Sequence, residues 1–107
     1  MVSLESNNYE KKLIPKNSFT VAGVSYCKDV CKSVKIDDIL TMVPDPENKY
    51  DNNAIKICNS KNEKCGYVPK LITTQIKNKH KKNLKVIDTG FYEGSYWIRV
   101  QIKKIIN

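Results

Sequence analysis

The chain has 107 residues, of which 40% are hydrophobic and 28% charged, and its formal net charge is +8 at pH 7. This length allows one domain with one core, and the composition is that of a folded globular protein, which excludes a fully disordered chain. No apolar run approaches the roughly 18 residues of a membrane-spanning helix, and the first residues lack the apolar core of a secretory signal. We therefore expect an intracellular protein without membrane contact.

The positive charge is carried by 18 lysines and one arginine, Arg99. Polyanionic partners gain from the release of counterions when they meet such a surface, and nucleic acid is the obvious candidate. Lysine also keeps a small domain soluble. Charge alone therefore leaves nucleic-acid binding and plain solubility equally open.

The start of the chain differs from the rest. Residues 1–16 are polar and mixed in charge, which predicts a flexible N-terminal arm ahead of a folded domain over residues 17–107. β-Branched and aromatic residues dominate residues 18–26 and predict a strand. Gly23 inside this run indicates a bulge or a close backbone approach.

The middle of the chain reads as short strands separated by polar loops. Residues 27–38 are expected to form a loop with a short helical turn, and residues 39–43 a second strand that ends at Pro44. Prolines, asparagines and aspartates then predict an ordered, turn-rich loop over residues 44–53. The side chains of residues 54–58 alternate between two faces, as in a strand. Together with the segment 65–68 they predict a hairpin.

One helix and two further strands complete the chain. Pro69 fits the first turn of a helix, and Leu71, Ile72 and Ile76 are expected to face the core. Residues 83–90 and 95–106 predict two strands joined by a loop over residues 91–94. Core-facing alternation is expected at Phe19, Val21, Tyr96, Ile98, Val100 and Ile102. The element order predicts a mainly β fold with one or two short helices, arranged as a small antiparallel barrel-like sheet.

Catalytic chemistry has little support in the residue inventory. His80, the only histidine, lies in a run of lysines and is expected to be solvated, and the four glycines are scattered singly, which excludes a phosphate-binding glycine loop. We predict no enzyme activity, no catalytic residue and no cofactor.

Four cysteines leave a metal site as an alternative: Cys27, Cys31, Cys58 and Cys65. Structural zinc sites use four such ligands, usually in pairs with two to four intervening residues. The second pair, Cys58 and Cys65, has six intervening residues, which is too many for this pattern. Free buried thiols are the favoured interpretation, with no metal bound.

Aromatic side chains among the lysines favour nucleic-acid binding, since stacking contributes about 1–3 kcal/mol per base and tolerates any sequence. Several of these rings must fill the core of so small a domain. Tyr50 is different, because it lies in a polar loop beside Asp51, where little local core is available to it.

Three blocks, residues 19–26, 46–55 and 66–70, resemble in residues, order and spacing those of the HIRAN domain. The central block, with Asn48, Tyr50, Asp51, Asn53 and Ala54 in register, is the specific part. HIRAN domains occur in SWI/SNF-type ATPases of the helicase-like transcription factor family, and also alone. The resemblance covers residues 18–106 and implies an OB-like β-barrel that captures the 3′ end of single-stranded DNA.

The resemblance also implies a set of DNA contacts. Tyr26 and Tyr50 match aromatics that stack on terminal bases, and Asp51 matches a carboxylate that accepts a hydrogen bond from the 3′-hydroxyl. Lys70 matches a phosphate-binding residue, and Phe91 or Tyr92 matches an aromatic in a late loop.

Two neighbours of Tyr26 depart from the family pattern. Ser25 stands where animal relatives commonly have a basic residue, and Cys27 where an aromatic is found, which predicts weaker end recognition. Asn52 is retained with Ser25 as a DNA contact, whereas Asn53 and Ala54 are expected to shape the loop.

The leading hypothesis is a non-enzymatic binder of single-stranded DNA 3′-hydroxyl ends, accessory to replication or repair, with a separate helicase, ATPase or nuclease as a further partner. We expect a monomer in the nucleus or cytoplasm, with a virus as one candidate source. Two alternatives stay open: a sequence-tolerant single-stranded DNA or RNA binder without end recognition, and a protein-interaction module that uses the same groove.

Overall fold

The computed structural model describes residues 17–74 and 83–103. The expected arm over residues 1–16, and the continuation of the expected helix with Ile76 and His80, lie outside the described residues. The elements, in chain order, are β1 (Ser18–Thr20), the 3₁₀ helix η1 (Val24–Tyr26), α2 (Lys28–Cys31), β2 (Ile39–Pro44), β3 (Ile55–Cys58), β4 (Lys64–Tyr67), α3 (Lys70–Thr73), β5 (Asn83–Tyr92) and β6 (Ser95–Ile102).

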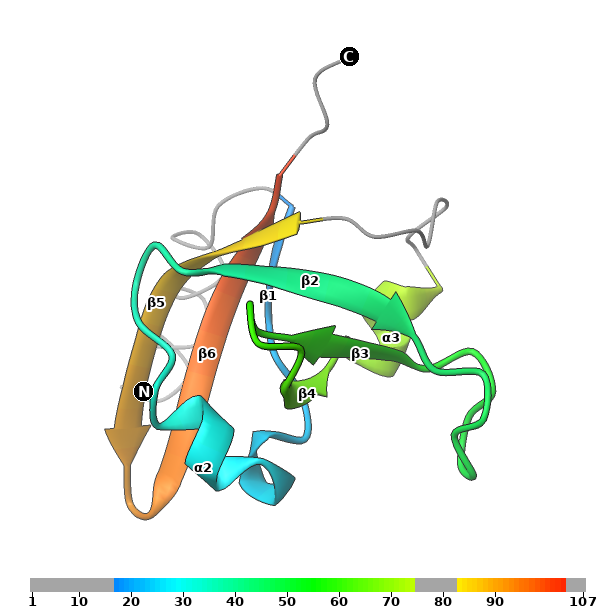
Figure 1. Cartoon of the computed structure of the whole chain (residues 1–107), viewed down its shortest axis with the longest axis horizontal. Coiled ribbons are helices and arrows are strands. Elements are labelled where there is room, and N and C mark those ends of the chain that lie inside the picture. Colours follow the sequence, from blue (N-terminus) through cyan, green and yellow to red (C-terminus); the bar gives the residue numbers. More distant parts are fainter. Residues whose placement is uncertain (1–16, 75–82, 104–107) are drawn as a thin grey trace, which may run out of the picture.

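All six strands belong to one antiparallel sheet in the order β1-β6-β5-β2-β3-β4. The sheet curls into a half-barrel, so that β1 runs between β6 and the β3–β4 hairpin in Figure 1. This arrangement confirms the mainly β, barrel-like fold with short helices.

Within residues 17–74 and 83–103, the two edges of the sheet meet at one bridge. Ala22, just after β1, and Tyr67, at the end of β4, exchange two backbone hydrogen bonds of 2.8 Å each. Gly66 allows this contact, because a Cβ atom there would overlap the carbonyl oxygen of Ala22 and lie 2.6 Å from Cγ1 of Val21. The bridge closes the half-barrel beside η1.

The core lies inside the curl and follows the alternation of the strands. Phe19 and Val21 are both buried, as are Ile98 and Val100, so the expected inward faces of the first and last strands are confirmed. The fully buried side chains come from β2, β3, β5, β6, α2 and β4: Leu40, Met42, Ile55, Ile57, Leu84, Val86, Ile98, Val100, Cys31, Cys58 and Cys65.

Local expectations were wrong at the last turn and at α3. The loop expected over residues 91–94 is shorter, because Glu93 and Gly94 both have positive φ angles, of 50° and 81°, and make the turn in two residues. Leu71 was expected to face the core, but it is 77% exposed, while Ile72 and Thr73 pack inward from α3. In the described part of the chain, no helix has the length and apolar character needed to cross a membrane.

Candidate nucleic-acid interface

Two tyrosines, one in η1 and one in the loop between β2 and β3, project almost completely into solvent. Tyr26 is 89% exposed and Tyr50 is 96% exposed. Both line a hollow of about 580 Å³, called here the tyrosine groove, which Gly23, Cys27, Asn48, Lys64 and Tyr67 also line. Aromatic rings left in water at the mouth of a hollow indicate a surface that contacts a partner.

A second hollow of about 560 Å³ lies beside the groove. It shares Tyr26, Cys27 and Lys64 with the groove, and η1 and α2 supply the rest of its wall: Ser25, Lys28, Asp29 and Val30. Tyr26 therefore stands between two hollows, and Lys64 reaches both. This second hollow, called here the side hollow, extends the tyrosine groove beyond the Tyr26 ring.

The exposure of Tyr26 follows from the end of β1. Gly23 adopts a left-handed conformation, with φ of 71°, and starts η1, where the sequence pattern predicted a continuous strand over residues 18–26. The Tyr26 amide bonds the Gly23 carbonyl at 3.1 Å, which tightens the turn. Because the chain leaves the sheet here, the tyrosine ring points away from the core.

Tyr50 is positioned by the loop between β2 and β3, and Asn48 organises that loop. The Oδ1 atom of Asn48 accepts hydrogen bonds from the amides of Tyr50, at 2.9 Å, and Asp51, at 3.1 Å. Asp51 Oδ1 in turn accepts a bond of 2.9 Å from the Asn53 amide. These Asx turns give the polar loop a defined shape and hold Tyr50 beside the half-buried Asp51.

Tyr67 connects the groove wall to this loop. Its hydroxyl donates to Asp45 Oδ2 at 3.1 Å and accepts bonds from Asn48 Nδ2 at 3.2 Å and Lys64 Nζ at 3.3 Å. The bond to Tyr67 raises the pKa of Lys64, so its ammonium group stays charged at the groove. An ammonium group held at the wall of the same hollow can bind phosphate while the two exposed rings stack on bases.

The predicted site residues separate into three groups. Tyr26 and Tyr50 share the groove, and Ser25 lies in the adjoining side hollow. Asp51 and exposed Asn52 follow Tyr50 in the same loop but line neither hollow.

The other two predicted residues lie apart from both hollows. Lys70 is exposed at the start of α3. Phe91 lies at the end of β5, where the sequence pattern predicted a loop, and its ring centroid is 4.6 Å from that of Tyr96. This cross-strand ring contact covers part of the Phe91 side chain, which is 58% exposed.

Three residues at the groove were not among the predicted DNA contacts: Asn48, Lys64 and Tyr67. Asn48 could have been recognised, since an asparagine two residues before Tyr50 in a turn-rich loop is typical of an Asx turn. Lys64 carried no such signal, because one lysine among 18 becomes a groove residue only when β4 crosses beside η1.

All four cysteines are buried and free. Burial raises the pKa of Cys31 to about 11 and that of Cys65 to about 12, so these thiols are protonated and unreactive near neutral pH. Across residues 17–74 and 83–103 no three histidine, cysteine or acidic side chains are placed to hold a metal ion. The cysteines therefore act as small core residues.

A family model, the HIRAN domain, matches residues 16–104, which is most of the chain. No curated protein and no solved structure matches the chain. The match covers β1 to β6 and includes the loop that carries Tyr50 and Asp51. The chain belongs to the HIRAN domain family, a family of DNA-binding domains.

Proposed function

We propose that this domain captures the 3′-hydroxyl end of single-stranded DNA in the tyrosine groove, without catalysing a reaction. The supporting observation is the pair of rings, Tyr26 and Tyr50, that stand almost fully exposed around one hollow with Lys64 at its wall. Terminal bases stack on these rings, and each stack contributes about 1–3 kcal/mol. Lys64, in β4, and Lys70, at the start of α3, bind the backbone phosphates.

Asp51 reads the terminus in this proposal. Its Oδ1 atom is engaged by the Asn53 amide, and within the described part of the chain Oδ2 accepts no hydrogen bond, so this oxygen is available to a 3′-hydroxyl. A terminal phosphate would bring negative charge against the carboxylate. The loop therefore favours a hydroxyl end over a phosphorylated end.

Ser25 and Cys27 limit the affinity. Ser25 contributes a neutral hydroxyl to the side hollow, and Cys27 contributes a buried thiol in place of a ring. Lys28 and Lys64, which line the same hollow, supply the positive charge there. We further propose that the domain serves DNA replication or repair inside the cell, as a monomer beside a separate helicase, ATPase or nuclease.

End chemistry tests the proposal directly. Fluorescence anisotropy would compare one labelled strand with a 3′-hydroxyl, the same strand with a 3′-phosphate, and a circular strand of equal length. We expect affinity for the hydroxyl end to exceed the other two by about tenfold or more, because a hydrogen bond to a charged group contributes about 1.5–3 kcal/mol. Equal affinity for all three would reject end capture and support a sequence-tolerant binder.

Matched variants identify the residues. Asp51→Asn should remove the preference for the hydroxyl end, whereas Glu47→Gln, an exposed acid in the same loop, should keep it. Tyr26→Ala and Tyr50→Ala should each weaken binding of every strand. Negligible affinity of the unaltered protein for all strands at physiological salt would instead support a protein-interaction module.

A further inference from the structure

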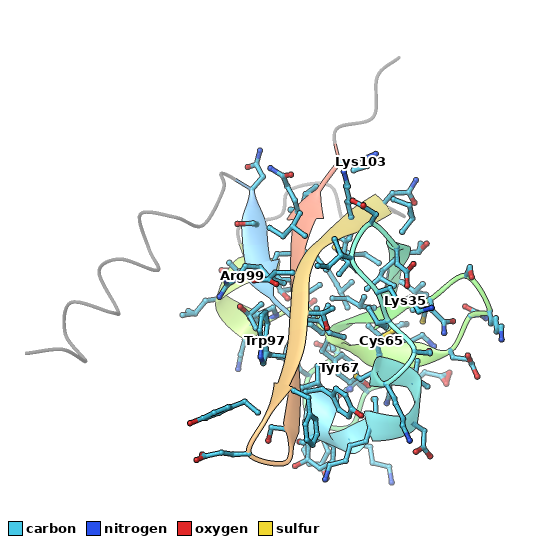
Figure 2. The ribbon with its side chains drawn as sticks, turned by 90° about the vertical axis from the view of Figure 1, so that its left-hand side faces the viewer. Lys35, Cys65, Tyr67, Trp97, Arg99 and Lys103 are labelled. Atoms are coloured by element: carbon cyan, nitrogen blue, oxygen red, sulfur yellow. The ribbon has the colours of Figure 1, made fainter. Side chains whose placement is uncertain are left out.

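The outer surface of the β5–β6 hairpin carries a separate hollow of about 450 Å³. It is lined by residues from three neighbouring strands: Thr20, Asp88, Tyr92, Trp97 and Arg99. None of these residues lines the tyrosine groove or the side hollow. Figure 2 shows Trp97 and Arg99 on one side of β5 and β6, with Tyr67 and Cys65 on the other. We call this feature the outer hollow.

Arg99, the single arginine of the chain, forms no ion pair within residues 17–74 and 83–103. Its Nε atom is buried and has no hydrogen-bond acceptor among residues 17–74 and 83–103. Asp88 faces Arg99 across the strands, yet its Oδ1 atom accepts from the Thr89 amide at 3.0 Å, and the ion pair found in the described region joins Lys85 and Asp37. A half-buried guanidinium that forms no ion pair keeps its terminal nitrogens free to bind an anion.

Trp97 fixes the position of this cation and supplies a flat apolar surface. The guanidinium carbon of Arg99 lies 6.0 Å from the Trp97 ring centroid, which is within reach of a cation–π interaction. On the facing strand, a Cβ atom at Gly90 would lie 2.6 Å from Cζ2 of Trp97, so the indole rests directly against the glycine backbone. Any larger residue at this position would displace the ring.

Tyr92 and Asp88 complete the chemistry of the hollow. Tyr92 is 71% exposed and provides a second aromatic side chain at the rim. Asp88 is half-buried and can accept a hydrogen bond from an amino group of a base, the pairing in which carboxylates contact cytosine. Phosphate, ring and amino group are the three features of a nucleotide that these side chains complement.

We propose that the outer hollow binds a nucleotide of a second nucleic-acid segment, with phosphate on Arg99, the base against Trp97 and Tyr92, and the base amino group on Asp88. The inference rests on nucleic acid as the ligand but is independent of end capture at Tyr50. Lys103 extends the same face, since it lies four residues beyond Arg99, about 13 Å along an extended chain. The domain would then hold two segments on opposite faces of its sheet.

Trp97 is the only tryptophan, so its emission reports on the outer hollow. Short oligonucleotides of deoxycytidine and of thymidine would be titrated into the protein and into the double variant Tyr26→Ala/Tyr50→Ala. We expect deoxycytidine to quench Trp97 with the same affinity, within about twofold, in both proteins, and thymidine, which lacks the amino group, to bind at least threefold more weakly. An unchanged emission, or a response lost in the double variant, would overturn the proposal.

Three variants locate the contacts. Arg99→Gln should weaken the Trp97 response at least tenfold, and Asp88→Asn should abolish the preference for deoxycytidine. Tyr92→Ala changes an exposed side chain and should weaken the response several-fold even if Arg99→Gln fails to fold. Lys61→Gln, an exposed lysine on the β3–β4 turn, is the charge control and should change nothing. If the groove assay finds no selectivity for the 3′-hydroxyl end, all these results should still be obtained. Failure of end capture can therefore be distinguished from failure of the outer-hollow proposal.

Discussion

Replacing Asn48 with alanine should weaken DNA binding as well as destabilise the fold. The side chain makes four hydrogen bonds: two hold the amides of Tyr50 and Asp51, and two reach the hydroxyl of Tyr67 and the carboxylate of Asp45. The loop is largely exposed, so water replaces much of what is lost, and we expect the free energy of unfolding to fall by about 2 kcal/mol.

The effect on affinity comes from the loop. Without its Asx turns, the backbone at Tyr50 and Asp51 must be ordered when DNA binds, at about 1 kcal/mol or more per residue. A total of about 2 kcal/mol corresponds to a roughly 30-fold increase in Kd, since 1.4 kcal/mol is tenfold. Fluorescence anisotropy with a 3′-hydroxyl strand and urea unfolding would measure the two quantities on the same sample.

Asn59 is a matched control. Its Oδ1 atom accepts from the amides of Lys61 at 3.0 Å and Glu63 at 2.9 Å, the same kind of turn on the β3–β4 hairpin, and it lines neither hollow beside Tyr26. Asn59→Ala should therefore lose a similar stability and keep its affinity. If both variants bind DNA equally well, the role assigned to Asn48 is wrong.

Three further results are expected. Gly66→Ala should lower the free energy of unfolding by about 2–3 kcal/mol in urea titrations, because its Cβ overlaps the main-chain carbonyl across the bridge between the sheet edges; an unchanged midpoint would contradict this packing. Burial raises the thiol pKa values of Cys31 and Cys65 from 9.0 to about 11 and 12. The contribution of these protonated thiols to the free energy of unfolding is therefore present in full below pH 9. It is lost as the pH rises toward those values, by about 1.4 kcal/mol per thiol and pH unit. Unfolding titrations between pH 8 and 10.5 should show this slope, and a Cys31→Ala/Cys65→Ala variant should show less of it; equal slopes would exclude the thiols as its source. Lys64→Gln should weaken DNA binding several-fold and reduce the slope of log affinity against log salt by about 0.7, the value for one phosphate of a single strand, whereas Lys61→Gln should leave the slope unchanged.

The strands were the predictable part of the fold. Alternation placed Phe19, Val21, Ile98 and Val100 in the core, because a strand with one buried face repeats its environment every second residue. Two-residue turns and short helices carry weaker signals. The chain left the sheet earlier than expected at Gly23, where a single positive φ angle decided the path.

The site was predictable where it depended on local chemistry. Tyr50 was expected to be exposed because its polar loop offers it no core, and it is 96% exposed. Lys64 and Tyr67 reach the groove only because the curl of the sheet brings β4 next to η1, a contact between segments about 40 residues apart in the chain. Such long-range placement leaves no periodic pattern in the sequence.

The bridge between Ala22 and Tyr67 makes barrel closure and groove assembly one event. Tyr67 uses its backbone to join the sheet edges and its hydroxyl to hold Asn48 and Lys64, so opening the bridge would also release the groove wall. A strand that binds the assembled groove alone stabilises the closed barrel by linkage, by about 2.7 kcal/mol at a hundredfold excess over Kd. Hydrogen exchange of the Ala22 and Tyr67 amides should then slow as more of the protein binds DNA. The rate at which the half-barrel opens at this bridge would therefore measure the free energy of DNA binding.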